Sequence, residues 1–353
     1  MCRALLASTV AISGLAACAT PGIDYETRIM PANLAAAETR TVQVDRFRGP
    51  AGGWYADRFA SMLANATLDG EPWFRLADFR YGGPGEGPAG TYTGHIDIDD
   101  YSVSEYTQTV SKCTEWDGLF DCETREDVEE LCISESVSVS VTPRLIDADT
   151  GQIMFSKSYG GEAGRDVCDE DHYHGFGGLF GSGRGAPPPE LVREALLETL
   201  RPIRNDIAPR NATVRAKFVR EAYDPMVKAD PRFEQAVKAG TRDPFAACDT
   251  WTAMAAQYPQ APAVIHNMGA CAEASHDFEA AHGLYAQAAE LAVKYGEGGT
   301  SAPKAFVQSL RRLSDHRFGL ELIEDLTGER DYLPVTPEGE SVTRPPQPDE
   351  AGS

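Results

Sequence analysis

The segment Ile133–Ile146 constrains the fold of this chain most strongly, because its apolar and polar residues alternate. Its valines fall on one face of an extended strand, and its serines fall on the other. The sequence DADTGQ that follows is typical of a turn, and Ile153–Tyr159 has the composition of a return strand. We therefore expect a β-hairpin centred near Thr150.

The N-terminus has the pattern of an export signal. One basic residue, Arg3, precedes the uncharged apolar residues 4–17. This stretch is shorter than the about 20 apolar residues that a transmembrane helix needs, and it fits the hydrophobic region of a secretory signal peptide. We expect residues 1–17 to be removed as a signal peptide, and the mature chain to fold in an oxidising compartment outside the cytoplasm.

The sequence Leu15-Ala16-Ala17-Cys18 resembles the lipobox of bacterial lipoproteins. The resemblance implies cleavage before Cys18, acylation of that cysteine, and attachment to a membrane through lipid alone. Residue 19 is Ala and not Asp, which by similarity to enteric lipoproteins favours the outer membrane, with the chain facing the periplasm. The alternative is a plain signal peptide whose cleavage site happens to include a cysteine.

Six further cysteines follow the signal, and an even number in an exported chain indicates disulfides. Cys132 and Cys168 each lie 18 residues from the centre of the expected hairpin, so they can close its base. Two others bracket the short loop TEWDGLFD, and the last two fall in a separate helical region. Zinc binding is the rival use, but no C-x₂-C spacing occurs. We expect the pairs Cys113–Cys122, Cys132–Cys168 and Cys248–Cys271.

The pattern on either side of the hairpin predicts an α/β domain over residues 39–210. In the expected strand Thr91–Val110, the alternation of apolar and polar residues shifts by one position at Asp99-Asp100, which predicts a β-bulge. The expected fold class is α+β, with a mixed sheet of about five strands and two packing helices, followed by an α-helical domain. Besides the hairpin, the expected strands are Thr41–Phe47, Trp73–Phe79 and Thr91–Val110, and the expected helices are Trp54–Leu68 and Glu190–Ile207.

From residue 31 to about residue 209, this order of elements resembles the curli secretion lipoprotein family. The motifs that carry the resemblance are PANL, VDRFRG, ADF, TGHI and LIDADTGQIMFS. The same fold is known in the N-terminal domain of the TolB translocation protein and in lipoprotein activators of peptidoglycan synthases. The resemblance implies an envelope protein with this α/β fold.

The segment Val264–Leu291 resembles the 34-residue tetratricopeptide repeat. Gly269 occupies the small position of its first helix. Three packing positions of the second helix recur 34 residues earlier, which predicts a helical domain of about two repeats over residues 211–330. Residues 18–38 are expected to form a tether, and residues 331–353, rich in Pro and Glu, to be disordered. The packing positions are Ala281, Tyr285 and Ala288, and Ala247, Trp251 and Met254.

Such repeats present a concave face made mostly by their first helices. We expect that face to include His266, Asn267 and Glu273 as partner-binding residues. Asn267 is the strongest candidate, because a carboxamide can both donate to and accept from a peptide backbone. The alternative is that Asn267 bonds only within its own repeat or faces solvent.

The sequence offers no constellation of catalytic residues. His172 and His174 lie near acidic residues 169–171, but a glycine-rich loop supplies neither converging ligands nor a second shell. No G-x-S-x-G, H-E-x-x-H or phosphate-binding glycine motif occurs. We therefore expect no metal, no cofactor and no enzymatic activity.

A formal net charge of −22 argues against nucleic acid or an anionic membrane surface as a partner. The expected function is that of a lipid-anchored adaptor in the cell envelope that binds another envelope protein. The alternative is a subunit of an outer-membrane secretion channel of the curli type. That alternative needs inserted hairpins with lipid-facing apolar strands, whereas the candidate insertions, residues 113–132 and 160–189, are charged or rich in glycine.

Overall fold

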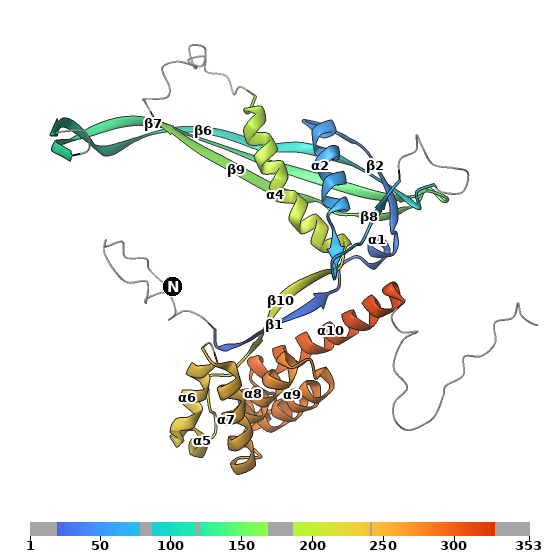
Figure 1. Cartoon of the computed structure of the whole chain (residues 1–353), viewed down its shortest axis with the longest axis vertical. Coiled ribbons are helices and arrows are strands. Elements are labelled where there is room, and N and C mark those ends of the chain that lie inside the picture. The colour runs from blue at the N-terminus through green and yellow to red at the C-terminus, as the bar shows by residue number, and fades with distance from the viewer. Residues whose placement is uncertain (1–19, 78–86, 118–120, 169–185, 241, 329–353) are drawn as a thin grey trace, which may run out of the picture. The chain divides into compact units, whose positions relative to one another are not determined.

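The computed structural model describes residues 20–77, 87–117, 121–168, 186–240 and 242–328 (Figure 1). The chain divides into an α/β unit, residues 31–210, and a helical unit built from the residues before 31 and after 210. The fold class is α+β, as predicted. Among the described residues, no helix is long and apolar enough to cross a membrane. The lipobox with Cys18 and the acidic loop with His172 and His174 lie outside the described residues.

The α/β unit contains a mixed six-stranded sheet. The strand order is β5-β2-β6-β7-β8, and β9 pairs with the other half of β7. The strand β2 is parallel to its neighbours β5 and β6, whereas the pairs that involve β7 are antiparallel. A separate two-stranded ribbon joins β3 (Thr67–Leu68) and β4 (Glu71–Pro72). The strands of the main sheet are β2 (Thr41–Arg48), β5 (Arg75–Leu76), β6 (Gly90–Asp117), β7 (Asp121–Asp147), β8 (Ile153–Ser156) and β9 (Tyr159–Cys168).

Two helices cover one face of this sheet (Figure 1). They are α2 (Gly52–Ala64) and α4 (Pro189–Ile207), and a short helix α1 (Leu34–Glu38) precedes β2. The ring of Phe59 in α2 lies 5.2 Å from the rings of Phe47 and Tyr92, so the aromatic stripe of α2 packs on β2 and β6. The helix α4 approaches β9 so closely that a Cβ at Gly161 would lie 2.0 Å from the carbonyl oxygen of Ala195.

The valines of β7 face these helices, and its serines lie on the opposite face. Val137, Val139 and Val141 are buried, as the alternation predicts. The predicted bulge is also confirmed, because the register between β6 and β7 shifts between Ile98 and Asp100. Both strands are much longer than predicted. The residues assigned to a charged insertion, 113–132, instead continue the ladder to its last pair, Asp117 with Asp121.

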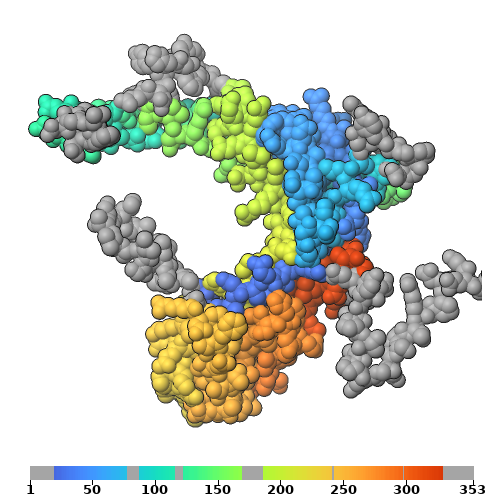
Figure 2. All heavy atoms as spheres, in the orientation of Figure 1, coloured from blue at the N-terminus to red at the C-terminus, as the bar shows by residue number. Residues whose placement is uncertain are grey.

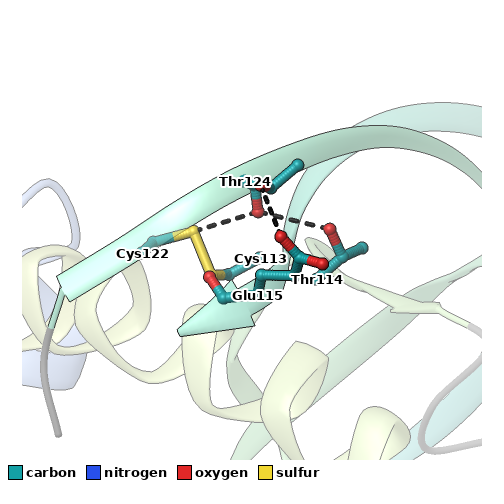
Figure 3. Close-up of a disulfide and its surroundings, with 5 residues drawn as sticks. All are labelled: Cys113, Thr114, Glu115, Cys122 and Thr124. Carbon is teal, nitrogen blue, oxygen red and sulfur yellow. Dashed lines mark hydrogen bonds between the residues drawn. A yellow bond between two sulfur atoms is a disulfide. The ribbon is translucent and has the colours of Figure 1, made fainter. Parts of the chain in front are cut away.

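All three expected disulfides are present, between Cys113 and Cys122, Cys132 and Cys168, and Cys248 and Cys271. Cys132 and Cys168 lie directly opposite each other on β7 and β9, as the hairpin arithmetic predicts. The first pair does not merely close a loop, because it joins two paired strands near the end of the hairpin (Figure 3). Beside it, the hydroxyl of Thr124 donates to Glu115 across the two strands, at 3.0 Å.

The helical unit contains α5 to α10 and two short 3₁₀ turns. The side chains of Asp224, Asp230, Asp243 and Asp277 cap helix N-termini by accepting from backbone N–H groups. All six predicted packing positions are fully buried. The helices are α5 (Pro225–Ala229), α6 (Pro231–Ala239), α7 (Pro244–Gln257), α8 (Pro262–Ala274), α9 (Phe278–Ala292) and α10 (Lys304–Thr327), and the 3₁₀ turns are η2 (Val293–Tyr295) and η3 (Glu297–Gly299).

The prediction of a tether over residues 18–38 is wrong for residues 22–38. The strand β1 (Gly22–Ile29) pairs with β10 (Arg210–Lys217), and α1 follows it. Ile23, Tyr25 and Thr27 turn inward at alternate positions and are nearly buried in the helical unit. Arg215 donates to Asp24 with two nitrogens at 2.6 Å each, and this exposed pair fixes the outer face of the ribbon.

Candidate functional site

The three residues predicted to bind a partner are buried inside the helical unit. His266, Asn267 and Glu273 all lie on α8 and expose at most 1% of their surface. Asn267 accepts from the backbone N–H of Val219 at 2.8 Å and donates to the carbonyl oxygen of Val219 at 3.1 Å. The carboxamide therefore binds a peptide backbone, but the backbone belongs to the segment of this same chain that follows β10.

His266 lies beside Asn267 in an aromatic environment. Its ring centroid is 4.7 Å from that of Tyr285 and 5.3 Å from that of Phe306. Its Nδ1 lies 3.3 Å from the Oδ1 of Asn267, whereas its Nε2 has no hydrogen-bond partner in the described part of the chain. Burial lowers the pKa of His266 to about 4, so the ring is neutral at neutral pH.

Glu273 joins four elements through its carboxylate. It accepts from the hydroxyls of Tyr25 in β1 and Tyr285 in α9, at 2.6 Å and 2.8 Å. Arg312 in α10 donates to both carboxylate oxygens at 2.6 Å. Burial by itself raises the pKa of Glu273, but the hydrogen bonds and charge of Arg312 outweigh burial and lower it. Glu273 therefore holds the helical unit together and is closed to an external ligand.

An open groove lies in the helical unit, beside β1 and between α7 and α8. It encloses about 440 Å³ and is lined by Ile23, Phe245, Met268, Leu284 and the disulfide from Cys248 to Cys271. Phe245 at its rim is 84% exposed. This apolar groove can accept a side chain from another molecule.

The most unusual feature of the α/β unit is a projecting ribbon, which we call the arm. We define the arm as residues 103–117 of β6 and 121–133 of β7. The ladder continues through the arm past the end of α4, and the space-filling view shows it as a narrow extension of the α/β unit (Figures 1 and 2). At about 3.4 Å per residue, its 15 residues of β6 reach about 50 Å.

The helix-covered face ends where the arm begins, at a buried ionic group. Glu135 is 5% exposed, accepts from the hydroxyl of Tyr101 at 2.7 Å, and pairs with Arg165 at 2.6 Å. Beyond it, apolar side chains are exposed on both strands, including Val103 at 52% and Leu131 at 44%. Apart from the buried Cys132, the described side chains of the arm are exposed or half-buried, so the arm adds little to the core.

Negative charge is concentrated on the arm and at its base. Residues 97–135 contain 13 acidic and two basic side chains, so they carry half of the formal net charge of the chain. Two ion pairs, Lys112–Glu130 and Arg165–Glu135, leave a large excess of carboxylates. Sequence reasoning missed the arm as a site, although this concentration of acids within one segment was a visible signal.

The serine face of the sheet is hollowed at the base of the arm. Asp100, Ser138 and Glu162 are successive cross-strand partners on β6, β7 and β9. They border a shallow depression of about 380 Å³ that Gly164 also lines. Two carboxylates thus face each other across a serine, which is a geometry suited to a cation between them.

The described residues contain no group of three or more His, Cys, Asp or Glu side chains that could hold a metal ion. His266 and Glu273 are polar residues of the kind used in catalysis, but both are buried among internal partners.

Comparisons with known proteins give little further guidance. No protein-family model matches the chain, and no curated protein matches it. A crystal structure of a "putative lipoprotein" from Caulobacter crescentus CB15 is similar over 49% of this chain and 90% of that chain, with 13% identity and a TM-score of 0.22.

Proposed function

We propose that this chain is a non-catalytic, lipid-anchored adaptor of the bacterial cell envelope, held in the outer membrane through Cys18 and facing the periplasm. It binds another envelope protein through the arm, which belongs to the curli-secretion-like α/β unit. The apolar groove of the tetratricopeptide-like helical unit provides a second contact. The observation that carries this proposal is the arm itself.

A two-stranded ribbon is only marginally stable by itself in water. Among the described residues, no helix covers the outer part of the arm, and the disulfide Cys113–Cys122 holds its strands together near the end. Valine, leucine and tyrosine side chains are exposed along it, such as Tyr106 at 38%, and are available to contact another surface. These features support a role in docking.

A long hairpin is also the observation that favours the alternative, a subunit of a secretion channel. Lipid-facing strands must present one continuous apolar face. Both faces of the arm carry carboxylates, with Glu126 and Glu130 on one face and Asp127 and Glu129 on the other. We therefore favour the adaptor, because an arm of this kind is suited to a polar partner in water.

Removal of the arm tests the adaptor proposal. Ser102 and Ser136 are cross-strand partners, so residues 103–135 can be replaced by an Asn-Gly turn in register, together with Cys168→Ser. We expect the intact lipoprotein, purified in detergent from envelopes, to bring down a protein partner that the armless variant loses, while the helical unit melts at an unchanged temperature. Equal recovery by both chains would exclude the arm as the docking element, and absence of any partner would contradict the adaptor.

Lipid anchoring is tested separately at Cys18. The Cys18→Ala variant is expected to appear as soluble or uncleaved protein, because acylation of this thiol is the only anchor that the lipobox provides. The wild-type chain should begin at Cys18, carry acyl chains and partition into detergent. Normal membrane retention of the variant would contradict the lipoprotein assignment.

A further inference from the structure

The strand β6 has a free edge along the base of the arm. The strand β2 pairs with β6 only as far as His95, and β7 occupies the opposite side of β6. From Asp97 to Thr109, no strand in the described part of the chain pairs with the outer edge of β6. Every second residue of an antiparallel strand directs its N–H and C=O groups away from its partner, so this edge can pair with another strand.

The composition of this edge suits an added strand. Val103 and Tyr106 are exposed, and the threonines at 107 and 109 have high β-propensity. Natural edges are usually protected by charged side chains, especially lysine, by proline or by a bulge, and the charges on this edge are all carboxylates. Residues 97–109 contain neither proline nor lysine, and their single bulge lies between Ile98 and Asp100.

The negative charge of the β6 edge determines which kind of partner strand it attracts. Asp97, Asp99 and Asp100 all lie on the serine face, where Ser140 donates to Asp99 at 2.9 Å and the depression between Asp100 and Glu162 begins. A second copy of the chain is disfavoured, because two arms of such high negative charge repel each other. A segment rich in lysine or arginine is attracted instead.

We infer that the free edge of β6 between Asp97 and Thr109 binds an extended, Lys/Arg-rich segment of a partner protein by strand addition, with its basic side chains beside Asp97 and Asp100 on the serine face. Main-chain hydrogen bonds to β6 align the segment, and the carboxylates of the serine face select its charge. This inference rests on the proposed adaptor function and names the chemistry of the partner.

The test uses a synthetic peptide of alternating threonine and lysine, titrated into the full-length chain in detergent. Two matched peptides separate the two causes of binding. One carries N-methyl groups on alternate backbone nitrogens, which keeps the charge but blocks the ladder, and the other has glutamate in place of lysine. We expect only the unmodified peptide to bind, and its affinity to fall as salt rises.

Matched variants locate the site. The double variant Asp97→Asn with Asp100→Asn is expected to weaken binding by about two- to thirtyfold, which is the range for two exposed ion pairs. The control pair Glu198→Gln with Glu290→Gln changes the net charge equally on exposed helical positions, and it should leave the affinity unchanged. Equal weakening by both pairs would show a non-specific charge effect and overturn the inference.

Two further outcomes would overturn it. Equal binding of the N-methylated peptide would exclude strand addition, and a dimer in sedimentation that the armless variant lacks would assign the edge to a second copy of the chain. If no peptide binds while the envelope partner still depends on the arm, the inference fails and the adaptor proposal stands. If partner recovery does not depend on the arm, the adaptor proposal fails as well.

Discussion

Replacing Glu273 with glutamine is expected to lower the free energy of unfolding of the helical unit by about 3 kcal/mol. The carboxylate is fully buried and receives hydrogen bonds from Tyr25, Tyr285 and Arg312. Its loss leaves Arg312 without its counter-charge, although the Arg312 side chain is 35% exposed and so retains some access to water. For this reason the expected loss is at the lower end of the range for a broken buried ion pair.

The measurement is urea unfolding, followed by hydrogen exchange in peptides from α8 and α9. A matched control is Glu234→Gln, which removes a carboxylate from an exposed pair with Lys238 on α6. That change should cost less than about 0.5 kcal/mol. Equal effects of the two substitutions would contradict the role assigned to Glu273.

Acidification is expected to destabilise the helical unit through His266. The pKa of His266 is lowered to about 4 by burial, against 6.5 in an unfolded chain. As the pH falls below 6.5, His266 binds a proton in the unfolded chain but not in the folded chain. Stability is therefore lost from about pH 6.5 down to about pH 4. The expected loss from this residue is about 2 kcal/mol at pH 5 relative to pH 8.

The His266→Phe variant should lose less stability over the same pH range, because a phenyl ring fits among Tyr285 and Phe306 and does not titrate. Burial also lowers the pKa of His316, so His316→Phe serves as a second variant that separates the two rings. Below about pH 4.5, protonation of Glu273 adds a further loss, because its pKa is lowered too. An unchanged pH profile in His266→Phe would contradict this account.

Much of the α/β unit could be predicted from the sequence, because one face of its sheet is buried. The alternating valines of β7 and the phase slip at Asp99-Asp100 both follow from that one-sided burial. The same symmetry about the hairpin centre predicted the pairing of Cys132 with Cys168. Hydrophobic periodicity predicts a strand where one face of that strand is buried and the other is exposed to solvent.

The arm could not be predicted in this way, because neither of its faces is buried. Its residues from Cys113 to Leu131 carry charge on both faces, so the periodic signal disappears although the strands remain paired. The strand β1 was missed for a different reason. Its partner β10 lies about 190 residues away in sequence, and no local pattern specifies a pairing across that distance.

The candidate site on α8 shows the same limit. The sequence placed Asn267 next to a packing position and predicted that its carboxamide binds a peptide backbone. The structure shows such a bond, but to Val219 of the same chain. The backbone segment that Asn267 binds is determined by how β10 and the segment after it cross the helices. Such a tertiary contact is not specified by the local sequence.

The most direct test of the central claim is photo-crosslinking of the lipidated chain in intact cells. A photoreactive amino acid is placed at Val103, which is 52% exposed on the arm, or at Phe245, which is 84% exposed at the rim of the groove. The account predicts an adduct between an envelope protein and the chain labelled at Val103. Adducts at Phe245 with none at Val103, or no adduct at either position, would contradict the claim that the arm is the docking element of this protein.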